Sequence, residues 1–134
     1  MPATVIDASA LGAIVFNEPE AQAVTERLGE SSLYAPALIW FELASICLKK
    51  VKQRPEQEEQ LVAALRRAAD MQIELAEVDH GDVVTLARST KLSTYDASYL
   101  WMARHIEEAE LVTLDQALDS AWREGQQSAE AATS

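Results

Sequence analysis

The sequence predicts an α/β protein with a mainly parallel sheet of four or five strands. Four short apolar segments alternate along the chain with longer segments whose apolar residues recur at helical spacing. Strands that alternate with helices form parallel sheets, because each helix returns the chain to the edge where the previous strand began. The chain has 134 residues, 49% of them hydrophobic, which is enough for one domain with a substantial core.

The beginning of the chain predicts two strands separated by two helices. Ala3–Ile6 is an apolar run typical of a buried strand, and a helix over Ala8–Phe16 should follow it. A second helix should restart around Pro19, which favours a first helical turn, and end at Gly29, a common C-terminal stop. Leu33–Ala35 then predicts a second, short strand.

The middle of the chain predicts two helices. The first, over Ala37–Gln53, is apolar nearly all round as far as Leu48, and we expect such a helix to be buried on most of its faces. The second begins at Pro55, where three glutamates occupy the first turn. Acidic residues are favourable there because they complement the helix dipole.

The last part of the chain predicts two more strands and three more helices. Ile73–Val78 largely alternates apolar and polar residues, as in a strand near a sheet edge, and a short helix over His80–Arg88 follows. Another helix should run from Ser93 to about Ile106, before a strand over Leu111–Leu114.

A final amphipathic helix over Gln116–Arg123 should be stopped by Gly125. The residues beyond it are small and polar, which is typical of a disordered terminus. We therefore expect a single domain over residues 1–124 and a disordered tail over residues 125–134.

Composition and charge limit the classes of protein. No apolar stretch is long enough to span a membrane, and the N-terminus lacks the features of a secretion signal. Cys47 is the only cysteine, so an internal disulfide is impossible, and a cytoplasmic location is expected. The net charge of −11 argues against a broad basic surface that grips nucleic acid. It is compatible with a cation-binding site, a local basic patch or a basic partner.

Four acidic residues are candidates for one shared site. Asp7 and Asp115 each follow a predicted strand, at the sheet edge where α/β proteins bind ligands. Asp96 lies in the first turn of a predicted helix, and each of these three aspartates could alone be a helix cap. Glu42 is different because it interrupts an apolar run, where a carboxylate must be paired, protonated or bound to a cation.

The four acids together favour a metal site. At roughly 4 Å and an effective dielectric constant of about 20, each pair of carboxylates repels by about 4 kcal/mol. A divalent cation removes this cost, and a site made of oxygen ligands suits Mg²⁺ or Mn²⁺. Nucleases use carboxylate-held metal ions to activate water and to stabilise phosphoryl oxygens.

A basic cluster follows at the end of the long helix and consists of Lys49, Lys50, Lys52 and Arg54. Its simplest explanation is a favourable interaction with the helix C-terminus together with solubility. The alternative is local contact with the phosphates of a nucleic acid, possible also for Arg66 and Arg67.

Several segments resemble the PIN-domain signature in order and spacing, over nearly the whole chain to about Arg123. They are Val5-Ile6-Asp7-Ala8-Ser9, Pro36 followed by Glu42-Leu43-Ala44, Leu92-Ser93-Thr94-Tyr95-Asp96-Ala97-Ser98-Tyr99, and Leu111-Val112-Thr113-Leu114-Asp115. The short chain resembles in particular the VapC-type toxins of bacterial toxin–antitoxin pairs.

The resemblance implies a three-layer α/β/α sandwich and a Mg²⁺- or Mn²⁺-dependent endoribonuclease. It implies structured RNA such as tRNA or rRNA as substrate, a cognate antitoxin as inhibitor, and a homodimer. It further implies that Ser9 and Thr113 support the acids or water, and that the metal-binding, catalytic acids are Asp7, Glu42, Asp96 and Asp115.

Two other classes remain open. A receiver-like signalling domain also gathers acids around Mg²⁺, but normally pairs adjacent acids early in the chain and uses a lysine near the end. Here Asp7 has no acidic neighbour, and no lysine follows Lys91. The other is a non-catalytic PIN-like module that binds a protein partner. An aspartyl phosphatase would need a second acid at position 9, which is serine.

Overall fold

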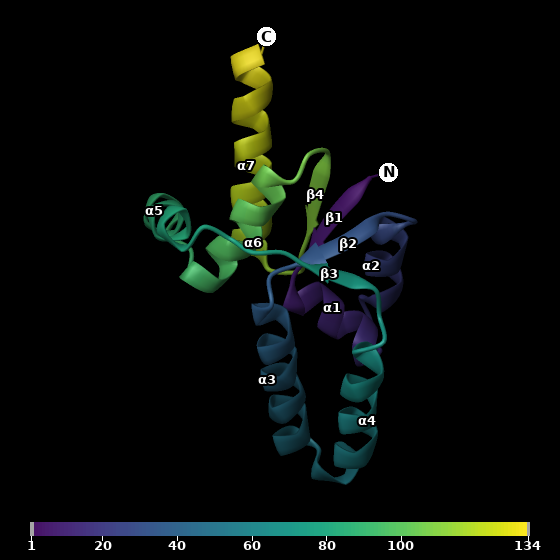
Figure 1. The fold of residues 1–134 in the computed structure, drawn as a ribbon. Helices are drawn as coiled ribbons and strands as arrows, with labels where there is room; N and C mark the ends of the chain where they lie inside the picture. Colours follow the sequence, from purple (N-terminus) through teal and green to yellow (C-terminus); the bar gives the residue numbers. More distant parts are fainter. Residues whose placement is uncertain (1, 134) are drawn as a thin grey trace.

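The computed structural model describes residues 2–133 and contains one sheet of four parallel strands (Figure 1). The strands are β1 (Ala3–Ile6), β2 (Ser32–Ala35), β3 (Ile73–Leu75) and β4 (Ala109–Val112). Their order across the sheet is β3-β2-β1-β4. The predicted α/β class and parallel sheet are therefore confirmed.

The central position of β1 explains its sequence. All four of its residues are buried, since β1 pairs with β2 on one side and with β4 on the other. In the register, Ala3 lies opposite Ser32 of β2 and Ile6 lies opposite Val112 of β4. Strand β3 lies at the edge, as predicted, and ends three residues earlier than expected, at Leu75.

Helices cover the sheet in two groups. They are α1 (Ala8–Val15), α2 (Ala21–Leu28), α3 (Leu38–Gln53), the 3₁₀ helix η1 (Pro55–Gln57), α4 (Glu58–Ala68), α5 (His80–Thr90), α6 (Thr94–His105) and α7 (Gln116–Thr133). Helix α1 contacts α2, α3 and α4, whereas α6 contacts α5, α7 and the strands β1 and β4. In Figure 1, α3 and α4 extend together from one side of the sheet and α7 extends from the other. This arrangement confirms the expected three layers.

The expected burial of α3 on most faces is wrong. Its buried residues are Ile39, Leu43 and Cys47, which are spaced four apart and form one stripe. Phe41 is 75% exposed and Leu48 is 53% exposed. Helix α3 reaches beyond the sheet with α1 and α4 as its main helical neighbours, so a single face is covered (Figure 1).

The expected end of the last helix at Gly125 is also wrong, whereas disorder of the tail in solution stays a prediction. Helix α7 continues through Gly125 to Thr133; the last residue, 134, lies outside the described residues. A glycine costs a helix only about 1 kcal/mol, and most residues that follow Gly125 are compatible with a helix. This glycine also allows a close approach, because a Cβ atom there would lie 2.6 Å from Nη2 of Arg104.

Two smaller shifts in the element boundaries also occur. Helix α1 ends at Val15 because Asn17 adopts a left-handed φ of +52°, so α2 begins only at Ala21. Strand β4 begins and ends two residues earlier than predicted, which leaves Thr113 and Leu114 beyond the strand. Over residues 2–133, no helix is long and apolar enough to cross a membrane.

Candidate active site

The sheet has a switch point at its carboxyl edge, between β1 and β4. From β1 the chain proceeds to β2 and β3 on one side, and later returns to place β4 on the other side. In open α/β sheets, ligands bind in the crevice at such a point. Asp7 directly follows β1, while Thr113 and Asp115 follow β4.

Asp7 is 4% exposed and both of its carboxylate oxygens accept hydrogen bonds. Oδ1 accepts from the backbone N–H of Ala10 at 3.0 Å and from Oγ of Ser9 at 2.7 Å. Oδ2 accepts from Oγ1 of Thr113 at 2.5 Å. Asp7 is therefore the N-cap of α1 and also a member of the cluster at the sheet edge.

Ser9 and Thr113 connect Asp7 to the turn after β4. Their hydroxyl oxygens lie 3.3 Å apart. Oγ of Ser9 accepts from the backbone N–H of Leu114 at 2.9 Å, and Oγ1 of Thr113 accepts from the N–H of Asp115 at 3.0 Å. Both hydroxyl groups thus hold Asp7 and Asp115 in fixed relative positions.

The two remaining aspartates have different local roles. Asp115 is half-buried and caps α7, since its Oδ1 accepts from the N–H of Leu118 at 2.9 Å. Asp96 is not the cap of α6; that role belongs to Ser93, whose Oγ accepts from the N–H of Asp96 at 3.1 Å. The capping explanation therefore accounts for Asp115 and fails for Asp96.

Glu42 is held by a tyrosine to which the sequence pattern gave no role. The hydroxyl group of Tyr99 donates to Oε1 of Glu42 at 2.6 Å, which links α6 to α3. Burial and the neighbouring Glu42 raise the pKa of Tyr99, so its hydroxyl stays protonated and donates. One feature of the sequence could have indicated that Tyr99 belongs to the site: it lies three residues after Asp96, on the same face of a helix.

All four acids line one pocket of about 560 Å³. None of the described residues that line it is Lys, Arg or His. The lining consists of Asp7, Ala8, Ser9, Leu38, Phe41, Glu42, Ser45, Ile46, Tyr95, Asp96, Tyr99 and Asp115. Carboxylates from the ends of two strands and from two helices therefore share one cavity without a cationic side chain.

Three acids of the pocket, Asp7, Glu42 and Asp96, have pKa values raised above those of free carboxyl groups. Burial raises the pKa of Asp7, although hydrogen bonds from Thr113, Ala10 and Ser9 oppose the effect. Burial is also the main reason why the pKa values of Glu42 and Asp96 are raised, and neighbouring carboxylates raise both further.

The donor atoms fit a divalent cation that prefers oxygen ligands. Positive charge in the pocket would offset both the burial and the mutual repulsion that raise these pKa values, and carboxylates are the ligands that Mg²⁺ and Mn²⁺ prefer. Among residues 2–133, however, no group of three or more aspartate, glutamate, histidine or cysteine side chains lies close enough together to hold a metal ion in this arrangement. The four acids therefore line one pocket without converging as a set of ligands.

The predicted basic cluster lies outside this pocket. Lys50 forms an ion pair with Glu18, and its ammonium group lies 5.8 Å from the ring centre of Phe16. Lys49, Lys52 and Arg54 are exposed at the opposite end of α3 from Glu42. The structure therefore places the basic cluster about two or more helical turns along α3 from Glu42.

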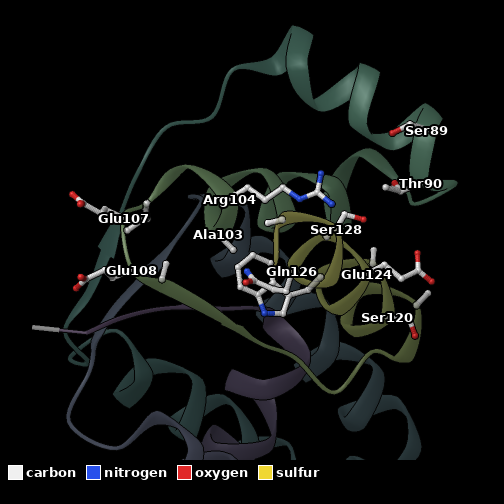
Figure 2. Close-up of a pocket in the computed structure, with 17 residues that line it drawn as sticks. Ser89, Thr90, Ala103, Arg104, Glu107, Glu108, Ser120, Glu124, Gln126 and Ser128 are labelled. Carbon is white, nitrogen blue, oxygen red and sulfur yellow. The ribbon is translucent and has the colours of Figure 1, made fainter. Parts of the chain in front are cut away.

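A larger cavity, of about 1060 Å³, lies between α7, the end of α6 and the loop that leads to β4 (Figure 2). It contains none of the four acids. In Figure 2, Arg104 lies along α7, and the carboxylates of Glu107 and Glu108 point away from that helix. Size alone therefore does not identify the site.

A carboxylate-lined pocket at the switch point of a parallel sheet can hold the kind of metal ion that nucleases use. The sequence pattern of the PIN domain matches residues 4–122, and the chain belongs to this family. PIN domains are typically metal-dependent nucleases. No curated protein sequence matches the chain.

One solved structure supports the fold independently. The crystal structure of PAE2754 from Pyrobaculum aerophilum superposes with a TM-score of 0.70 and 22% sequence identity, covering 90% of this chain and 86% of that chain. At this identity the likeness establishes the fold. The receiver-like alternative is excluded, because receiver-type sheets have the strand order 2-1-3-4-5 and this sheet has the order β3-β2-β1-β4.

Proposed function

We propose that this protein is an endoribonuclease that requires Mg²⁺ or Mn²⁺ and acts as the toxin of a type II toxin–antitoxin pair. The observation that supports the activity is the gathering of four carboxylates around one pocket whose described lining has no basic side chain. Such a pocket accumulates negative charge that a bound cation would neutralise.

The residues that would hold the cation are Asp7, Glu42, Asp96 and Asp115. When bound, a divalent cation supplies the charge that activates water and stabilises the phosphate during hydrolysis of a phosphodiester. Asp7 is oriented for this role by Ser9 and Thr113, and Glu42 is oriented by Tyr99. These hydrogen bonds restrict Asp7 and Glu42 before a ligand arrives, which reduces the cost of ordering them when it binds.

The substrate and partners follow from the resemblance to VapC-type toxins. We propose a structured cellular RNA of the tRNA or rRNA class as substrate, a cognate antitoxin as inhibitor, and a cytoplasmic homodimer. Lys49, Lys52 and Arg54 are exposed and available for phosphate contacts, whereas Lys50 is engaged by Glu18. At 1.5 Å per residue, Lys49 lies about 10 Å along α3 from Glu42, a distance that an extended RNA strand can span.

The nuclease is tested by incubating total cellular RNA with the purified protein. We expect discrete products with Mn²⁺ or Mg²⁺ and none with a chelator. Asp96→Asn should abolish cleavage by removing one carboxylate, whereas Asp70→Asn, an exposed acid outside the pocket, should cleave normally. Absence of both cleavage and Mn²⁺ binding in the wild-type protein would instead favour a non-catalytic PIN-like module that binds a protein.

The toxin role is tested separately in cells. Induced expression in bacteria should arrest growth, and Asp96→Asn should not, at equal protein levels. Coexpression of the reading frame adjacent to the gene should restore growth if it encodes the antitoxin. Normal growth despite nuclease activity in vitro would refute the toxin role and leave the enzyme activity intact.

A further inference from the structure

We infer that Phe41 and Tyr95 stack against unpaired bases of RNA at the mouth of the acidic pocket. The inference rests on the proposed nuclease function and specifies its substrate as a single-stranded region. Phe41 is 75% exposed and Tyr95 is 60% exposed, although both are large aromatic side chains.

The position of these two rings distinguishes them from other exposed apolar side chains. Phe41 and Tyr95 line the pocket that contains the four acids. Other large hydrophobic side chains that are exposed in the described part of the chain do not line it, namely Leu48, Leu75, Val84 and Leu114. Both exposed Phe and Tyr rings among the described residues therefore lie at the acidic pocket, and Tyr95 also lines a neighbouring pocket.

Each ring is also adjacent in sequence to one of the acids. Phe41 precedes Glu42 on α3, and Tyr95 precedes Asp96 on α6. Consecutive helical residues point about 100° apart, so each ring lies beside its carboxylate and does not cover it. A nucleotide whose base contacts a ring would therefore have its phosphate close to the acids.

The charge of the pocket favours stacking over ionic contact. The protein has a net charge of −11, and none of the described residues that line the pocket is basic. Ionic contacts to phosphate from basic side chains are thus unavailable close to the acids, which leaves uncharged contacts to supply affinity there. Stacking of a base on an aromatic ring provides about 1–3 kcal/mol in nucleic-acid-binding proteins.

Stacking also selects the form of RNA. Bases in a duplex already stack on their neighbours, whereas bases in loops, bulges and single strands can stack on a protein ring. We therefore expect the pocket to accept loops or single strands and to reject duplex RNA.

The test uses a short single-stranded RNA that carries 2-aminopurine, whose fluorescence is quenched when it stacks. Binding is measured in a chelator, so that no cleavage occurs. We expect wild-type protein to quench the fluorescence, and Phe41→Ala and Tyr95→Ala each to weaken binding about 10-fold and reduce quenching. Tyr95→Phe keeps the ring and should bind like the wild type.

Leu48→Ala is the matched control. Leu48 is also exposed on α3, seven residues after Phe41 and thus on a similar face, but it lies outside the pocket. Its replacement removes exposed apolar surface without removing a ring from the rim. Its RNA affinity should equal that of the wild type, and so should the melting temperature of every variant.

Different outcomes separate this inference from the proposed function. Metal-dependent cleavage with unchanged affinity and quenching in a Phe41→Ala, Tyr95→Ala double variant would overturn the stacking role and leave the nuclease standing. If these variants instead change only self-association, measured by sedimentation, the rings form a protein interface and the inference is wrong. A wild-type protein that neither binds nor cleaves RNA would refute both.

Discussion

Tyr99 joins the two helices on either side of the acidic pocket. It is 1% exposed, and its hydroxyl group donates to Glu42. This hydrogen bond lowers the pKa of Glu42 and so opposes the effect of burial. The tyrosine therefore helps to keep Glu42 ionised, which is the state that binds a cation.

Replacing Tyr99 by Phe should shift the pH dependence of Mn²⁺ binding. Without the hydroxyl group the pKa of Glu42 rises further, so binding should require a higher pH. The free energy of unfolding should fall by only about 1 kcal/mol, the net value of one hydrogen bond. Isothermal titration calorimetry at several pH values measures the shift. Tyr34→Phe, in β2 and outside the pocket, is the control, and an unchanged pH profile in Tyr99→Phe would contradict the positioning role.

In the absence of metal, the stability of the fold should depend on pH. Burial raises the pKa values of Asp7, Glu42 and Asp96, so the folded protein binds their protons more tightly than the unfolded chain does. Their contribution to stability is therefore fully present below the unfolded pKa of about 4 and is lost as the pH rises through the raised values.

Asp96→Asn should reduce the loss of folding stability that occurs as the pH rises. Urea unfolding in a chelator, from pH 4 to pH 8, should show a smaller decline for the variant than for the wild type. At pH 8 the variant should be more stable by roughly 1 kcal/mol, the size of a solvent-screened interaction between charges. Asp70→Asn should follow the wild-type curve. A variant that is less stable than the wild type at pH 8 would show that Asp96 stabilises the fold.

At the scale of elements, α3 shows that an apolar pattern can predict a helix without determining which of its faces are buried. Its sequence predicts a helix over nearly the observed range, because residue type and spacing determine helix formation locally. Burial depends on neighbours, and α3 extends past the sheet, which the local sequence does not encode. The end of α7 was mispredicted for the same reason, because it depends on neighbours. Gly125 lies close to Arg104, a residue of another helix, and the local sequence does not encode that proximity.

The two faces of α3 make a direct prediction. Leu43 is 0% exposed in the core, so Leu43→Ala should reduce the free energy of unfolding by about 2–5 kcal/mol. Leu48→Ala, on the exposed face of the same helix, should change it by less than about 0.5 kcal/mol. Urea denaturation of both variants measures the difference. Equal effects would mean that α3 is covered on both faces in solution.

At the scale of the whole molecule, the site could be predicted in part. Strand ends and the isolated charge of Glu42 indicated which acids would meet, and the structure places all four around one pocket. Their catalytic and metal-binding roles stay predictions. The partnership between Tyr99 and Glu42 could not be predicted, because it joins residues 57 positions apart through packing alone.

Metal binding should stabilise the whole fold. A ligand that binds only the folded state adds about 2.7 kcal/mol at 100 times its Kd. We expect Mn²⁺ to raise the melting temperature of the wild type and to have a much smaller effect on Asp96→Asn. Sodium chloride at equal ionic strength controls for screening of the net charge of −11. An equal rise in both proteins would indicate non-specific screening.

The pairing of β1 with β4 has a consequence for biosynthesis. Asp7 leaves the ribosome well before its hydrogen-bond partner Thr113, which lies 106 positions later in the chain. Asp96 and Asp115 are likewise translated long after Asp7. A nascent chain that stops before Asp115 therefore lacks an assembled pocket, so any hydrolytic activity must await translation of that residue.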